Sequence, residues 1–268
     1  MSATAAIALN VFRESVRDKI LYNLVLFAVV MIGASYLIGQ LTAGQDVKII
    51  KDLGLSATSV FGLFIAVFIG IGLVSKEVDR RSVYSLLAKP IRRSQMIAGK
   101  YAGLTLTLIV NVSIMAAALY AVLAYMAWGT PENIKQAWDA PALDPAMLKA
   151  VALILVELMI ITAIALFFST FSTPMLSAAL TFGLFIVGHF SNDLRNFDQV
   201  VDSPATAVVA RALYWLLPNL AQFDVKSLVV HADPVPLGYM AMAAAYAALY
   251  IAVLLVASMA VFSRRDFK

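Results

Sequence analysis

The sequence contains no cysteine, and it has only two histidines among its 268 residues. Without cysteine there is no disulfide framework, no thiolate metal site and no thiol nucleophile. The two histidines, His189 and His231, do not have the spacing of a metal-ligand pair. We therefore disfavour a metal site and expect His189 to be a hydrogen-bonding residue at a membrane interface.

Charge is also scarce. Charged residues make up 13% of the chain and hydrophobic residues 62%, and the mean hydropathy is +0.88. Soluble domains have about a quarter charged and about half apolar residues, and a soluble protein with this composition would expose aggregating apolar patches. The composition predicts an integral membrane protein. Its basic residues lie beside apolar segments and do not alternate with aromatics along a groove, so we expect no nucleic acid partner.

Long apolar runs are what the sequence has instead. A bilayer core of about 30 Å requires about 20 apolar helical residues. Six segments fit or nearly fit this length: 20–39, 57–75, 97–128, 150–168, 175–190 and 237–262. The fifth is the shortest. The fold class we expect is all-α, a polytopic membrane protein with six transmembrane helices in a single domain over residues 1–268.

The basic residues indicate the orientation. Cytoplasmic loops carry an excess of Lys and Arg. One set of span ends is dense in them: Arg13, Arg17, Lys19, Lys76, Arg80, Arg81, Lys89, Arg92, Arg93, Lys100, Arg264, Arg265 and Lys268. The opposite loops are longer and poorer in basic residues. Because an even number of spans puts both termini on one side, we expect a multi-pass protein of the cell inner (cytoplasmic) membrane with both termini in the cytoplasm.

Three further elements are expected around the spans. Before the first span, Ile7, Val11 and Phe12 share one side of a helical wheel, which predicts an amphipathic helix lying in the membrane interface. Between spans four and five, Thr173 and Pro174 are suited to cap and start a helix. In the last outer loop, the Ser203-Pro204 pair and Pro218 bracket a short outer helix before the last span.

A charged island at residues 76–93 separates the second and third spans. From Glu77 the chain is compatible with a helix until Pro90, which cannot continue one. Val83, Leu86 and Leu87 share one face of this helix. Such a short amphipathic helix can dock into a groove of another protein. The simpler alternative is that its basic residues fix the orientation and bind anionic lipids.

The order of residue types in the island resembles the first cytoplasmic loop of permeases of the ABC-2 family of ABC transporters. The matching positions are Glu77, Arg80, Arg81, Ser82, Leu86, Leu87, Pro90, Arg93, Gly99 and Lys100. Many family members have Gly-Thr where this chain has Ser82-Val83. That difference fits a branch similar to permeases associated with copper-enzyme maturation. The resemblance extends to the six spans, to the Leu217-Pro218-Asn219 turn and to the C-terminal segment.

This resemblance implies a permease subunit, not an enzyme, that exports a substrate. It implies two kinds of protein partner, namely ATP-binding-cassette ATPase subunits and a second copy of the chain or a similar permease, within membrane lipids. The chain has no G-x-x-x-x-G-K-[ST] motif, so we expect it to bind no cofactor directly, with ATP and Mg on the ATPase. The island would be the coupling helix. Leu86 and Leu87 would enter an apolar cleft of the ATPase, and Arg80, Arg81, Arg92 and Arg93 would meet acidic rims or lipid.

Two polar residues stand out within the apolar spans. Glu157 is about two turns inside the fourth span, where a carboxyl is costly and is expected to be neutral or partnered. It could line a substrate path or contact a partner permease. Alternatively it makes an ordinary helix–helix hydrogen bond, with Asn111 of the third span as a possible partner. The pair Gly99-x-x-x-Gly103 could allow close helix contact, but such pairs are common and we rank it low.

Two other functions stay open. A secondary transporter or channel would show intramembrane charges or broken helices in matched halves, and the two halves here are dissimilar. An intramembrane enzyme would need paired catalytic groups at one depth, whereas Glu157 stands nearly alone in sequence. The presence or absence of an ATP-binding-cassette subunit beside this chain discriminates these functions from the permease.

Overall fold

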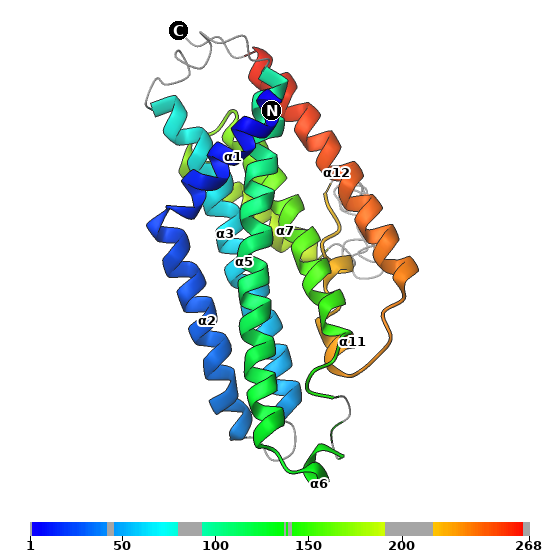
Figure 1. Ribbon diagram of the computed structural model, residues 1–268. Helices are drawn as coiled ribbons and strands as arrows, with labels where there is room; N and C mark the ends of the chain where they lie inside the picture. Colours follow the sequence, from blue (N-terminus) through cyan, green and yellow to red (C-terminus); the bar gives the residue numbers. More distant parts are fainter. Residues whose placement is uncertain are drawn as a thin grey trace, which may run out of the picture.

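The computed structural model describes residues 2–41, 46–79, 93–136, 138, 141–190 and 217–264, and for 73–79, 93 and 263–264 only the backbone. Every regular element in these ranges is a helix (Figure 1), which confirms the all-α prediction there. The helices are α1 (Ala3–Val16), α2 (Lys19–Gln40), α3 (Asp46–Asp79), α5 (Arg93–Gly129), α6 (Glu132–Lys135), α7 (Met147–Ser169), α8 (Pro174–His189), η2 (Ala221–Phe223), α11 (Lys226–Val230) and α12 (Leu237–Arg264).

Five helices among the described residues are long and apolar enough to cross a membrane. Their candidate spans are Lys19–Gln40, Asp46–Gly72, Ser94–Gly129, Met147–Ser169 and Leu237–Phe262. The predicted fifth span corresponds to α8, which has only 16 residues and falls just short of the range of about 17–25 for a spanning helix. The count of six spans is therefore not confirmed by length and stays a prediction.

The helix starts follow from local capping chemistry. Ser2 caps α1, and its Oγ accepts a hydrogen bond from the Ala5 amide at 3.3 Å. Asp18 caps α2 by accepting from the Ile20 amide at 2.9 Å. At α8, Thr173 accepts from the Leu176 amide at 3.4 Å, and Pro174 occupies the first turn. These caps satisfy amides that have no partner inside their own helix, and the predicted start of α8 is confirmed.

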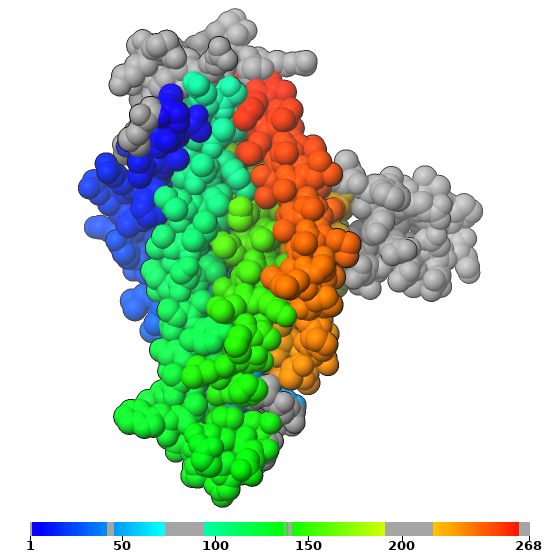
Figure 2. Space-filling model, turned by 45° about the vertical axis from the view of Figure 1, so that its right-hand side comes forward, coloured from blue at the N-terminus to red at the C-terminus, as the bar shows by residue number. Residues whose placement is uncertain are grey.

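The helices form an elongated bundle around α3 and α7. In Figure 1, α2 and α12 run along opposite flanks, and α3, α5 and α7 lie between them. Helix α3 packs against α2, α5, α7 and α8, and α7 packs against α12 and α5 as well. Figure 2 shows α12 as a long ridge along the side of the molecule, next to α7. The outward faces of α2 and α12 expose large apolar side chains, including Phe27 and Leu249, as expected for helices that face lipid.

Helix α3 begins eleven residues earlier than the predicted span, in a stretch expected to be an outer loop. This stretch contains Lys51, whose side chain is completely buried. The Lys51 ammonium donates to the Pro141 carbonyl at 2.9 Å and lies 3.9 Å from Asp144 Oδ2. A buried charge is tolerated when it is hydrogen-bonded and paired, so partners in the 141–146 segment allow the helix to continue through charged residues.

Helix α1 packs across the first turns of α5, with Val11 buried between them. A Cβ atom on Gly99 would lie 2.8 Å from Ile7 Cβ, and one on Gly103 would lie 2.6 Å from the Ala8 carbonyl oxygen. Only glycine permits so close an approach. The Gly99-x-x-x-Gly103 pair, which the sequence analysis ranked low, therefore forms a helix–helix contact. The predicted apolar face of α1 is confirmed as a packing face, but it covers protein. Its place at the bilayer surface stays a prediction.

Candidate functional site

The predicted coupling helix falls almost entirely outside the described residues. Segment 80–92 contains Arg80, Arg81, Ser82, Val83, Leu86, Leu87, Pro90 and Arg92, and none of these is described. Glu77 belongs to the last turns of α3, and Arg93 is the first residue of α5. The structure thus defines the two attachment points of the segment, and the roles assigned to its side chains stay predictions.

Both attachment points are continuous with membrane-spanning helices. The apolar run of α3 continues to Ser75, and the helix continues to Asp79. Helix α5 begins at Arg93, one residue before its candidate span. Since α3 and α5 pack against each other, segment 80–92 leaves and re-enters the bundle at one end. Figure 1 shows α1 and the end of α12 at this same end. A force on the segment would act directly on two core helices, and through α5 on α1.

The two intramembrane polar residues, Asn111 and Glu157, do not form the hydrogen bond that was suggested between them. Asn111 is buried, but its Nδ2 donates to the Thr107 carbonyl of its own helix at 2.7 Å. This bond along the helix gives one of its donors a partner on α5 itself. No hydrogen bond joins Asn111 to Glu157, and the Glu157 carboxylate faces His189 instead.

Glu157 lies on α7 and is 2% exposed. Its Oε1 is 3.3 Å from Nε2 of His189 on α8, but this Oε1 has no hydrogen bond of good geometry within the described residues. His189 Nδ1 faces the Phe185 carbonyl at 3.1 Å, so Nδ1 must carry a proton. Nε2 of the neutral imidazole then carries a lone pair, which repels a carboxylate oxygen. The contact is favourable only if one further proton lies between the two atoms, bound either to the Glu157 carboxyl or to His189 Nε2.

The meeting of these two residues follows from the shared hairpin at 169–174. Counting back along α7 from Ser169, Glu157 lies about 18 Å away, and counting along α8 from Pro174, His189 lies about 22 Å away. Because α8 is short, its last residue reaches the depth of a residue in the middle of α7. Similar distances from a tight hairpin are the signal that could have paired them, whereas hydropathy alone predicts His189 at an outer interface.

Segment 217–236 contacts the end of α8 and one side of α12. The Leu220 amide donates to the Gly188 carbonyl at 3.0 Å, and the Asn219 amide donates to Tyr246 Oη on α12 at 2.9 Å. Phe223 is completely buried. Among the described residues, the side-chain atoms Asn219 Oδ1 and Gln222 Nε2 are buried without a hydrogen-bond partner. The Leu217-Pro218-Asn219 turn therefore links the end of α8 to α12.

Two short helices in this segment, η2 and α11, were not predicted, and the predicted outer helix lies outside the described residues except for its last positions. Helix α11 packs on α3 and α7. It begins with Lys226, whose ammonium lies 3.6 Å from Asp224 Oδ2. In the part of the chain that the structure describes, no three His, Asp or Glu side chains gather as a metal site.

Comparison with known proteins supplies the identity of this bundle. A family model described as "ABC-2 family transporter protein" matches residues 5–267, nearly the entire chain. No curated protein matches the chain. The family match includes the N-terminal helix, all the candidate spans and the segment between α3 and α5. The chain therefore belongs to the ABC-2 family of transporter proteins and is a multi-pass membrane component of transport rather than a catalyst.

Proposed function

We propose that this chain is the permease subunit of an ATP-binding-cassette transporter, with ATP and Mg²⁺ bound by separate ATPase subunits. The observation that carries the proposal is the family match over residues 5–267. A second support is the absence of a phosphate-binding P-loop motif from the sequence. If transport is driven by ATP, the ATP must then be hydrolysed by another chain. We further propose that the permease resides in the cytoplasmic membrane with both termini inside the cell, and that transport is export.

Coupling to the ATPase is assigned to the charged island at residues 76–93, which includes Glu77 and Arg93. Its two ends continue into α3 and α5, which are both core helices. Leu86 and Leu87 would supply the apolar contact with the ATPase, and Pro90 would end the coupling helix. Arg80, Arg81, Arg92 and Arg93 would meet acidic groups or lipid headgroups. A shift of the ATPase would then tilt α3 and α5 together.

The permease is proposed to work as a pair, with a second copy or a similar permease. The outward face of α2, which carries Leu26, Phe27 and Met31, is apolar enough to meet either lipid or such a partner. Helix α8, too short to span by itself, would gain cover from a partner. The narrower assignment to permeases associated with copper-enzyme maturation rests on Ser82-Val83 and stays a prediction.

Co-purification tests the coupling proposal. The chain is co-expressed with a candidate ATP-binding-cassette ATPase, and the ATPase retained in mild detergent is quantified. Leu86→Asp and Leu87→Asp should each reduce retention at least tenfold, which corresponds to about 1.4 kcal/mol, because a carboxylate cannot enter an apolar cleft without loss of solvation. Ser85→Asp adds the same charge outside the proposed apolar face and is the matched control.

Membrane insertion of every variant is checked by the yield and elution volume of the detergent-solubilised protein. Equal retention of the ATPase by parent, Leu86→Asp and Leu87→Asp would contradict the assignment of the coupling pair. If the parent retains no ATPase at all, a secondary transporter or channel becomes the better description of the chain.

A further inference from the structure

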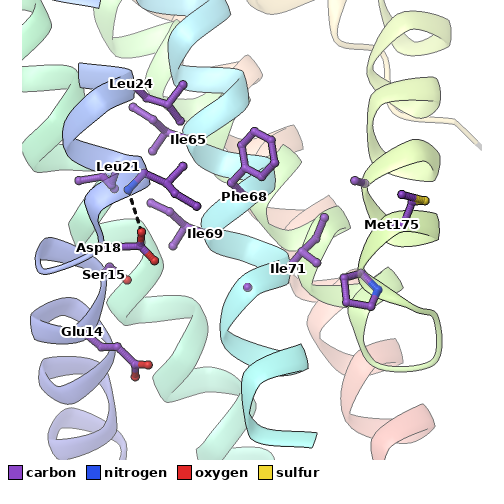
Figure 3. Close-up of a pocket in the computed structure, with 14 residues that line it drawn as sticks. Glu14, Ser15, Asp18, Leu21, Leu24, Ile65, Phe68, Ile69, Ile71 and Met175 are labelled. Carbon is purple, nitrogen blue, oxygen red and sulfur yellow. Dashed lines mark hydrogen bonds between the residues drawn. The ribbon is translucent and has the colours of Figure 1, made fainter. Parts of the chain in front are cut away.

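A cavity of about 430 Å³ lies where α1 meets α2 and opens between α2, α3 and α8. This volume is within the range of about 300–1,000 Å³ that small-molecule sites occupy. Figure 3 shows α3 between the other two helices, with Leu24 of α2 on one side and Met175 of α8 on the other. Most of the wall is apolar and includes Leu21, Leu24, Ile65, Phe68, Met175 and Ala178.

One end of the cavity is polar and carries two carboxyl groups, and the flanking residues Arg13, Arg17 and Lys19 carry the opposite charge on the same segment. Glu14 and Ser15, from the last turn of α1, and Asp18, the cap of α2, form this end. Ser15 is 4% exposed, and its Oγ has no hydrogen-bond partner among the described residues. A buried hydroxyl without a partner is costly and requires an explanation. The cavity supplies one if a polar group of a ligand is bound beside Ser15.

The polar end lies where the membrane-spanning segments end. Asp18 directly precedes the candidate span of α2, Gly72 of α3 lies four residues before Lys76, the first charged residue after the apolar run, and Pro174 starts α8. The three helices therefore place the polar wall at the boundary of the hydrocarbon core, and the apolar wall extends from it toward the middle of the bilayer. This polarity matches an amphiphile with its headgroup beside α1 and a hydrocarbon chain along α3.

The charge of the wall selects the headgroup. Carboxylates repel an anionic headgroup, and they attract an ammonium. A primary ammonium has three donors, which can serve the Glu14 carboxylate and the orphaned Ser15 hydroxyl together. A quaternary ammonium has no donor and could not satisfy Ser15. Lys19 follows the cap residue Asp18 and is exposed, so its ammonium can bind a lipid phosphate.

We propose that this cavity is a binding site for a phospholipid with a primary ammonium headgroup, such as phosphatidylethanolamine. The ammonium binds at Glu14 and Ser15, and one acyl chain lies against α3 between α2 and α8. The site lies within one chain, so lipid binding can be tested independently of the ATPase partner and of the direction of transport.

Lipid retention in native mass spectrometry tests the site. The purified chain in mild detergent is titrated with palmitoyl-oleoyl phosphatidylethanolamine, phosphatidylcholine or phosphatidylglycerol. The parent should retain phosphatidylethanolamine about tenfold better than phosphatidylglycerol and about threefold better than phosphatidylcholine. Phosphoethanolamine, which has the same ammonium and phosphate but no acyl chains, should not displace the bound lipid at equal concentration.

Two variants separate the headgroup contact from the chain contact. Glu14→Gln removes the carboxylate and should lower the preference for phosphatidylethanolamine at least threefold, whereas Glu132→Gln removes an exposed carboxylate paired with Lys135 on α6 and should not change it. Ala178→Phe fills the apolar part of the cavity and should reduce retention of all three lipids. Leu180→Phe adds bulk at an exposed position of α8 that does not line the cavity and should leave retention unchanged.

Circular dichroism verifies that each variant is folded. The proposal is overturned if the parent retains the three lipids equally, if Glu14→Gln keeps the full preference, or if Ala178→Phe binds as the parent does. Displacement by phosphoethanolamine alone would also overturn it, because the site would then recognise a free amine rather than a lipid.

Discussion

At the scale of single residues, two buried polar side chains of this protein have different kinds of partner. Glu157 and His189 lie on neighbouring helices at one level of the bundle, 3.3 Å apart. Asn111, on α5, bonds to its own helix instead. A carboxyl in an apolar bundle is costly when it is alone, so the histidine should contribute to the stability of α7 and α8 together.

A double-mutant cycle between Glu157→Gln and His189→Gln measures this contribution. We expect a coupling energy of about 1 kcal/mol, within the range of about 0.5–3 kcal/mol for residues in contact, because each single change removes the charge or the proton that the other residue meets. The measurement is the shift of the thermal unfolding midpoint in detergent for each single variant and for the pair.

The matched control is a second double-mutant cycle, in which Glu157→Gln is combined with Asn111→Ala instead of His189→Gln. Effects of Asn111→Ala and Glu157→Gln should add, since no hydrogen bond joins the two side chains. Strong coupling of Glu157 to Asn111 with none to His189 would contradict the pairing in the structure.

At the scale of elements, close helix approach at glycines holds α1 on the bundle. The Ala8 carbonyl of α1 would be 2.6 Å from a Cβ at position 103 of α5. Such a contact cannot be accommodated without moving one helix, because the obstructing atom is backbone. Helix α1 is therefore tied to the start of α5, the helix that follows the proposed coupling segment.

Gly103→Ala should consequently destabilise the protein by about 1–3 kcal/mol, the usual cost of overpacking, and should raise amide hydrogen exchange across α1. Gly33→Ala is the matched control, because nothing lies within 4 Å of a Cβ built there. That change should be neutral or stabilising by about 0.5–1 kcal/mol, since alanine is the better helix former. If both substitutions have the same sign and leave α1 protected, the packing of α1 on α5 is not as described.

At the scale of the whole molecule, the orientation and the number of crossings can be tested directly because the chain has no cysteine. Single cysteines at Ser94, Phe171 and Asp233 probe exposed positions near the start of α5, after α7 and before α12. With a membrane-impermeant maleimide, Ser94→Cys and Phe171→Cys should label only from the cytoplasmic side. Asp233→Cys should label only from the outside.

The comparison of Phe171→Cys with Asp233→Cys addresses α8 in particular. Labelling from opposite sides requires the chain to cross the membrane between them, as six spans demand. Labelling of both from one side would contradict the sixth span. The cysteine-free parent is the control for background labelling in both orientations.

The amino-acid sequence by itself determined the class of the protein and the approximate position of its helices. Apolar runs of spanning length and local caps such as Thr173-Pro174 are properties of short stretches of chain, so they can be seen without a fold. The charged island and its order of residue types indicated the ABC-2 family for the same reason, and the family match confirms that assignment. Functional roles within the island stay predictions.

The tertiary structure decided which distant residues meet. Lys51 is helical and buried because the carbonyl of Pro141 and the carboxylate of Asp144 lie beside it. Glu157 faces His189 because the short α8 ends at its depth, and the cavity beside Ser15 exists because α1, α2, α3 and α8 converge at one end. Hydropathy and charge along a chain indicate the environment that each residue prefers. Contacts between helices depend on the lengths and the packing of the helices, and these are defined only in the folded bundle.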